Sequence, residues 1–257
     1  MSAFVRNWHT HTTRCKHAKG TDREMVLAAI EAGVKVLGFA DHTPYPGISP
    51  WGEGIRMSTT QTAEYFASLT GLGAEYADQI ELHYGFEAEY LPELFDGLLE
   101  HLAQFPCEYL ILGQHSSNAN PVYYGAPTND AAVLHSYVDE VIAGMETGKF
   151  AYVAHPDLIN FTGDAAEQHS AFLRLCEAAK ALNIPLEVNM LGLNQGRNYP
   201  CEAFFRTAQE VGNTLILGAD AHSPAEMGDV DGMTRCRAWA EQFGLPIIDT
   251  IEFTLKK

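Results

Sequence analysis

We expect neither an export signal nor a membrane span in this sequence, and its cysteines form no pattern. Its first eleven residues contain no basic segment followed by an apolar stretch, so we expect no signal peptide. No apolar run approaches the roughly 18 residues that a membrane-spanning helix needs. The five cysteines are scattered without a CxxC pair, which is typical of reduced thiols. These absences predict a cytoplasmic protein that does not bind a membrane.

Positive charge is also scarce. The chain has 16 lysines and arginines against 33 aspartates and glutamates, and its formal net charge is −17. Such a field repels nucleic acid and anionic lipid, so we expect neither as a partner. Bound divalent cations would offset part of the charge locally. The composition leaves open whether the chain forms a homo-oligomer.

The chain has no low-complexity tract, no close internal repeat and no linker rich in proline or glycine. Its 257 residues, 46% of them hydrophobic, are enough to bury a large core. Length alone does not decide between one domain and two, because α/β barrels of this size are often single domains. Without a linker, we expect one domain over residues 1–257.

Short apolar runs alternate with amphipathic stretches, a pattern typical of repeated β–α units. We predict strands at residues 4–9, 36–41, 81–87, 109–113, 151–155, 185–189 and 215–220. Residues 21–24 form a capping box that opens a helix ending at Gly33. Further helices are predicted at residues 130–147, 166–182 and 202–211. Repeated β–α units favour a parallel sheet or barrel, and seven strands indicate a barrel one unit short of eight.

Metal-type side chains gather at the carboxyl ends of these predicted strands. Six of the seven strands end in, or are closely followed by, such residues: His9, His11, Asp41, His42, Glu87, His115, His155, Asp220 and His222. Parallel α/β folds build their sites at that edge. A random scatter of eleven histidines would not line up in this way.

Each motif alone also has a purely structural interpretation. Strand alternation places His9 and His11 on one face, about 7 Å apart, but a buried histidine is often only a packing residue. The Asp220-Ala221-His222 motif allows the same two interpretations. Two such pairs, together with histidines at other strand ends, favour a metal site. Imidazole and carboxylate ligands suit zinc, manganese or iron. Cys15 could also be a ligand, but without a partner thiol we expect it to lie near the site without binding.

The motifs also occur in a recognisable order. They are His9-Thr10-His11 with His17 six residues on, and residues 38–42, 85–89, 113–115, 154–156 and 218–222. Together they resemble the PHP (polymerase and histidinol phosphatase) family, in particular its stand-alone histidinol-phosphatase branch. Any one motif is unspecific, so the resemblance depends on their order and spacing over nearly the whole chain.

The resemblance implies a distorted (β/α)7 barrel that holds two to three divalent metal ions, Zn, Mn or Fe. Carried over by position, the first metal would bind His9, His11, Glu87 and Asp220. The second would bind Glu87, His115 and His155, and the third His17, His42 and His222. His17 enters this set only through the resemblance, since by itself it is a loop histidine.

The same branch is similar in residues 187–189 and 199–200 and commonly binds phosphate through arginines. Arg197, in the loop after the sixth predicted strand, suits that role, although a surface arginine is the alternative. The chain departs from the branch at residues 116–118, where Ser-Ser-Asn replaces apolar and acidic residues. It departs again at Asn160, where no second arginine is found. If Arg197 is not the phosphate ligand, the next candidates are Arg14, Lys16, Lys19 and Arg56.

We therefore expect hydrolysis of a small phosphate monoester, with L-histidinol phosphate as the first choice. In this mechanism a metal-bridging hydroxide attacks phosphorus in line, and Arg197 helps to balance the charge. Asp220 or His222 would protonate the leaving alkoxide, and the sequence does not decide between them. One alternative is a related phosphoesterase acting on a nucleotide or another small ester. The other is a non-catalytic metal-dependent module, against which the complete ligand set argues.

Overall fold

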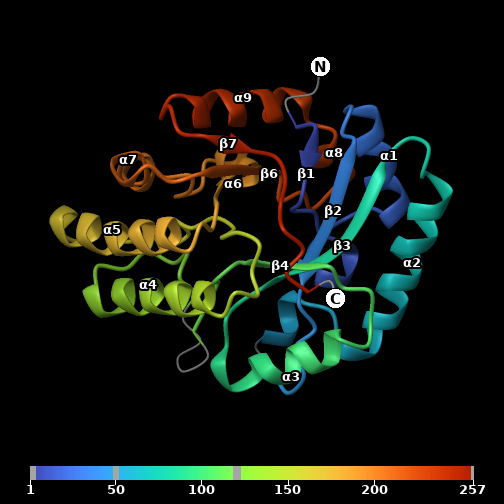
Figure 1. Cartoon of the computed structure of the whole chain (residues 1–257), viewed down its shortest axis with the longest axis horizontal. Helices are drawn as coiled ribbons and strands as arrows, with labels where there is room; N and C mark the ends of the chain where they lie inside the picture. The colour runs from blue at the N-terminus through green and yellow to red at the C-terminus, as the bar shows by residue number, and fades with distance from the viewer. Residues whose placement is uncertain (1–3, 49–51, 118–122, 256–257) are drawn as a thin grey trace.

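The computed structural model describes residues 4–48, 52–117 and 123–255 and contains two parallel sheets (Figure 1). The first has the order β1 (Arg6–Asn7), β2 (Val36–His42), β3 (Glu81–Ala88) and β4 (Tyr109–Leu112). The second has the order β5 (Leu186–Asn189), β6 (Leu215–Gly218) and β7 (Ile247–Ile248). Every strand pair is parallel, as the repeated β–α pattern predicts.

Isolated backbone bridges join the two sheets into a ring. Val153 bridges Leu112 of β4 on one side and Leu186 of β5 on the other. At the opposite seam, Thr10 just beyond β1 bridges Ala221 just beyond β6. The strand predicted at residues 151–155 is therefore present only as this single rung between β4 and β5. The ring of seven segments confirms the distorted barrel, while the short β7 was not predicted.

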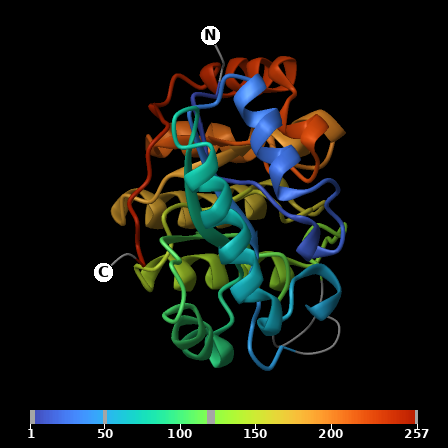
Figure 2. The same ribbon diagram turned by 90° about the vertical axis from the view of Figure 1, so that its right-hand side faces the viewer.

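Helices surround the ring. They are α1 (Asp22–Glu31), α2 (Thr62–Glu75), α3 (Pro92–Leu102), α4 (Ala131–Glu146), α5 (Ala165–Ala181), α6 (Met190–Gln195), α7 (Glu202–Val211), α8 (Pro224–Met227) and α9 (Val230–Glu241). Short 3-10 turns are η1 (Thr13–Cys15), η2 (Gly52–Ile55) and η3 (Thr59–Gln61). In Figure 1, α4, α5 and α7 lie on one side of the molecule and α2 on the other. Figure 2 shows α1 and α2 in front of the first sheet. None of the described helices is long and apolar enough to cross a membrane.

The helix boundaries follow local capping chemistry. Thr21 and Glu24 form the predicted capping box at the start of α1, and the chain turns after the helix at Gly33, with φ +83°. Asp130 and Asp164 cap α4 and α5 by accepting hydrogen bonds from backbone N–H groups. The helices predicted at 130–147, 166–182 and 202–211 are thus confirmed to within one residue at each end.

The interior of the ring is a packed core at its amino end. The Tyr109 hydroxyl of β4 donates to the backbone carbonyls of Trp8, at 3.0 Å, and Phe39, at 3.1 Å. Since the segments that carry Tyr109 and Trp8 are not neighbours in the ring, this contact crosses its interior. Gly38 permits the crossing, because a Cβ there would lie 2.2 Å from the Tyr109 hydroxyl. Side chains at the amino end therefore fill the interior of the ring. The carboxyl ends of the strands lie beyond this core and remain available for a site.

Candidate metal centre

A cavity of about 610 Å³ opens where the carboxyl ends of the strands meet. All nine residues predicted as metal ligands lie at or directly beneath it. Seven line the cavity: His17, His42, Glu87, His115, His155, Asp220 and His222. His9 and His11 are fully buried below them and contact the same carboxylates. The structure thus brings the whole predicted ligand set together.

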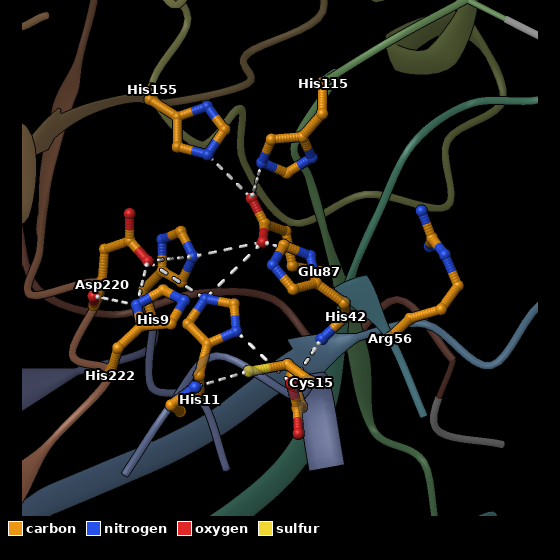
Figure 3. A network of polar contacts seen from close by, with 12 residues as sticks. His9, His11, Cys15, His42, Arg56, Glu87, His115, His155, Asp220 and His222 are labelled. Atoms are coloured by element: carbon orange, nitrogen blue, oxygen red, sulfur yellow. Dashed lines mark hydrogen bonds and ion pairs between the residues drawn. The ribbon is translucent and has the colours of Figure 1, made fainter. Parts of the chain in front are cut away.

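Glu87 is at the centre of this cluster (Figure 3). Five ring nitrogens lie within 3.6 Å of its two carboxylate oxygens, those of His9, His11, His42, His115 and His155. Burial alone would raise the pKa of Glu87, but the charges of the surrounding histidines outweigh it and hold this pKa well below its usual value. The side chain of Glu87 is therefore ionised, and imidazole nitrogens face both of its carboxylate oxygens.

Asp220 forms a second group with His9 and His11. Its Oδ1 lies 3.0 Å from His11 Nε2 and 3.4 Å from His9 Nε2, and Oδ2 accepts a hydrogen bond from Asn189 at 3.1 Å. The backbone of Asp220 has φ +50°, in the left-handed region that side chains other than glycine rarely adopt. Such strain persists where the surroundings fix it and often marks a functional site. Here it accompanies a buried carboxylate that contacts two imidazoles.

His17, His42 and His222 form a third group, whose ligand atoms lie within 4.8 Å of one another. His17 Nδ1 is 2.8 Å from the Cys15 carbonyl oxygen, and His222 Nδ1 is 2.9 Å from the Asp220 carbonyl oxygen. A carbonyl only accepts, so each Nδ1 carries a hydrogen and each Nε2 of a neutral ring presents a lone pair.

These two Nε2 atoms of His17 and His222 lie 3.0 Å apart. Burial, followed by the charge of His11, lowers the pKa of both rings, that of His222 to about 3, so both are neutral near pH 7. Two lone pairs at this separation repel each other unless a cation lies between them. The donor set therefore fits a metal ion on chemical grounds.

Other buried ring nitrogens of the cluster also fit a bound metal ion. Nε2 of His9, Nε2 of His11 and Nδ1 of His42 are buried and make no hydrogen bond within residues 4–48, 52–117 and 123–255. A buried polar atom without a partner costs about 1–3 kcal/mol. Burial tends to lower the pKa of His11, but the close contact of Nε2 with the Asp220 carboxylate and the hydrogen bond of Nδ1 with Asp41 raise it to about 9. Protons on such rings supply positive charge where a cation would otherwise do so.

Three carboxylates contact the ring nitrogens of His9, His11 and His115 that face away from the cluster. The sequence did not reveal this orienting role. Glu187 Oε1 lies 2.8 Å from His9 Nδ1, Asp41 Oδ1 lies 3.4 Å from His11 Nδ1, and Glu89 Oε1 lies 3.1 Å from His115 Nδ1. Metal-binding histidines usually have such a partner on their other nitrogen. The available signal was strand alternation, because Glu89 is two residues beyond Glu87 and shares its face.

Arg197 lines the same cavity, at its exposed edge. Its Nε donates to Gln195 Oε1 at 3.0 Å and its Nη1 to the Tyr199 hydroxyl at 2.5 Å. Within the described residues it makes no ion pair with a carboxylate. Asn160, where the resemblance led us to look for a second arginine, donates to the Gly125 carbonyl and does not line the cavity. Of the divergent 116–118 segment, Ser116 lines the cavity and Asn118 lies outside the described residues.

A parallel barrel that carries a buried imidazole–carboxylate cluster at the carboxyl ends of its strands is typical of proteins with a multinuclear metal site. The profile of the PHP domain family matches residues 7–191, and the chain belongs to this family. The chain is 30% identical, over 86% of its own length and 87% of the relative's, to a probable histidinol-phosphatase of Deinococcus radiodurans. It is 23% identical to a histidinol-phosphatase of Bacillus subtilis, over 87% of this chain and 95% of that one.

The fold also matches a solved structure. The histidinol phosphate phosphatase of Lactococcus lactis superposes with a TM-score of 0.76 over 98% of both chains, at 18% identity. That crystal structure contains zinc, L-histidinol and phosphate. At this identity the likeness establishes the barrel architecture.

Proposed function

We propose that this chain is a metal-dependent phosphoesterase that hydrolyses L-histidinol phosphate to L-histidinol and phosphate. The whole of residues 1–257 would act as one catalytic domain. The observation that carries the proposal is the opening of the imidazole–carboxylate cluster into the cavity that Arg197 also lines. The named relatives from Deinococcus radiodurans and Bacillus subtilis support the reaction. The Lactococcus lactis structure supports it too, because it holds both products of that hydrolysis.

We assign the metals to overlapping subsets of these donors. The first would be held by His9, His11, Glu87 and Asp220, the second by Glu87, His115 and His155, and the third by His17, His42 and His222. When bound, two or three such ions (Zn, Mn or Fe) supply a nucleophilic water at neutral pH and neutralise charge on the phosphate oxygens.

The protein's own side chains hold the parts in position. Arg197 binds the phosphate through paired N–H groups and keeps the ester aligned for in-line displacement. Glu187, Asp41 and Glu89 fix the rings of His9, His11 and His115, so that the same nitrogen of each faces the cluster. Ordering the rings before the substrate arrives lowers the reorganisation that the reaction requires.

The leaving alkoxide needs a proton, and Asp220 and His222 both line the cavity where it would form. The two are distinguished by leaving-group dependence. The residue that supplies the proton should lose more activity on an alkyl phosphate than on p-nitrophenyl phosphate, whose leaving group needs none. Asp220→Asn and His222→Gln are therefore compared on both esters at matched metal content.

A phosphate-release panel tests the proposed substrate. Metal-loaded protein is assayed with L-histidinol phosphate, nucleoside monophosphates, sugar phosphates and a phosphodiester. We expect the highest kcat/KM on L-histidinol phosphate. Preference for a nucleotide would favour the related phosphoesterase, and no turnover of any ester by metal-loaded protein would favour the non-catalytic module.

We also propose a reducing, cytoplasmic location. All five cysteines are free thiols, and four of them are buried. Protein isolated without reductant and then unfolded should therefore titrate as five thiols, whereas a lower count would indicate disulfides and contradict this location.

A further inference from the structure

Two lysine or arginine side chains line the cavity in the described part of the chain, Arg197 and Lys19. Arg197 has polar partners in Gln195 and Tyr199. The Lys19 side chain is exposed to solvent, and no hydrogen bond or ion pair holds its ammonium group within the described residues. An exposed ammonium group at the mouth of a cavity proposed to hold a phosphate ester indicates a role in binding.

The other cations near the site already have partners. Arg14 pairs with Asp22 and Glu64, and the buried Arg56 pairs with Glu89 through two contacts of 3.1 Å. Lys16, three residues before Lys19, donates to the Glu53 carbonyl. None of these three side chains lines the cavity.

The backbone of Lys19 is fixed beside the proposed third metal group. Its N–H donates to the His222 carbonyl at 2.7 Å, which ties the loop after β1 to the loop after β6. The next residue, Gly20, has φ +84°, and a Cβ there would lie 2.6 Å from the Pro224 side chain. The loop therefore packs directly against the start of α8, and the Lys19 side chain begins from a fixed point on the cavity wall.

We propose that Lys19 is a second phosphate-binding residue and that it acts together with Arg197. The inference rests on the proposed function. Lys19 comes from the loop after β1 and Arg197 from the loop that follows α6, and the two flank the loop that carries Asp220 and His222. A phosphate monoester has a charge near −2 at pH 7, whereas a diester has −1. Two separate cations therefore favour the monoester.

The test measures anion binding directly. Metal-loaded parent, Lys19→Ala, Lys19→Arg and Lys16→Ala proteins are titrated with inorganic phosphate by calorimetry and assayed with p-nitrophenyl phosphate and bis-p-nitrophenyl phosphate. Lys16→Ala is the matched control, because it removes an exposed lysine from the same loop but not from the cavity. Metal content and circular dichroism are measured for every protein.

We expect Lys19→Ala to weaken phosphate binding and to raise KM for the monoester, each about tenfold, as for loss of one charge-assisted contact. The rate on the diester should change less than twofold, metal content should not change, and Lys19→Arg should restore most of the binding. Lys16→Ala should match the parent. Parental phosphate affinity in Lys19→Ala, or an equal loss in Lys16→Ala, would overturn the inference.

The same data separate this inference from the proposed function. A parent that hydrolyses no phosphate ester, yet binds phosphate in a Lys19-dependent way, would overturn the function and support the binding role. An active parent with no dependence on Lys19 would overturn the binding role alone. If Lys19→Ala does not fold, Lys19→Gln provides the same loss of charge with the side-chain length retained.

Discussion

The two ends of the barrel bury side chains of opposite character. At the amino end, Trp8, Tyr109 and Tyr152 pack with aliphatic residues, and the Tyr109 hydroxyl has two carbonyl acceptors. At the carboxyl end, the imidazoles of His9 and His11 and the carboxylate of Glu87 are equally buried, yet Nε2 of each ring lacks a hydrogen-bond partner within the described residues. One end satisfies its polar groups internally, whereas the other gathers ring nitrogens and carboxylates that a bound cation would link.

This difference indicates how the fold divides its tasks. The amino-end cluster provides burial free energy that does not depend on any ligand. The carboxyl-end cluster crowds imidazoles and carboxylates together, which lowers the free energy of unfolding. A bound metal would offset this loss. Changes at the two ends should therefore separate stability from activity, and the following predictions test that separation in order of decreasing effect.

The largest effect is expected for Glu87→Gln. Because Glu87 contacts five imidazoles and is shared by two of the proposed metal groups, its loss should lower kcat on the order of 10³-fold or more and reduce bound metal. The fold should survive, as judged by circular dichroism. Steady-state kinetics with elemental analysis checks this, and near-parental activity with full metal content would remove Glu87 from the site.

The opposite result is expected at the amino end. Ile216 of β6 is buried in the Trp8–Tyr109 cluster, so Ile216→Ala should lower the free energy of unfolding by about 2–5 kcal/mol. Metal content and kcat should remain within about twofold of the parent under conditions where the variant is folded. Denaturant unfolding and kinetics on the same sample measure both. Loss of metal with little loss of stability would contradict the division between the two ends.

Arg197→Ala should produce a purely functional loss. If the guanidinium binds phosphate in the transition state, kcat/KM should fall by a factor equivalent to about 2–4 kcal/mol. Metal content should not change, because arginine is not a ligand. Arg197→Lys should rescue only in part, since a point charge does not reproduce two parallel hydrogen bonds. Parental kinetics in Arg197→Ala would show that it is only a surface residue.

A smaller effect is expected for a residue that orients a proposed ligand without binding metal itself. Glu187 contacts His9 Nδ1 at 2.8 Å and accepts the His155 backbone N–H at 2.9 Å. Glu187→Gln keeps the shape but weakens the orienting contact, so metal affinity should fall about 10–100-fold. Competition with a chelator of known affinity measures it. Unchanged affinity would show that Glu187 supports the backbone alone.

The sequence was sufficient to predict which side chains meet at this rim, His17 apart, because parallel strands bring their carboxyl ends to one edge. His9, Glu87 and Asp220 lie far apart in the chain, yet each ends or follows a strand, and the ring closes around them. The segment at residues 151–155 was harder to predict. Its apolar pattern is that of a full strand, but only Val153 pairs with the neighbouring strands. The strand β7 has only two residues and shows no periodicity.

Loop residues could not be assigned in the same way. Lys19 reaches the cavity because its N–H bonds to the carbonyl of His222, a contact between residues 203 positions apart that no local pattern encodes. Lys16 has the same charge in the same loop and turns instead toward Glu53. The roles of Glu187 and Glu89 depend likewise on which ring nitrogen they face, which follows from the closed barrel rather than from spacing.

The metal content of the intact chain tests the central claim most directly. Protein purified without chelator, and again after dialysis against Zn²⁺ or Mn²⁺, is analysed by inductively coupled plasma mass spectrometry. The nine imidazole and carboxylate residues gathered at this rim predict two to three divalent ions per chain. A value well below one, with no gain after incubation with either metal, would contradict the multinuclear site and the reaction built on it.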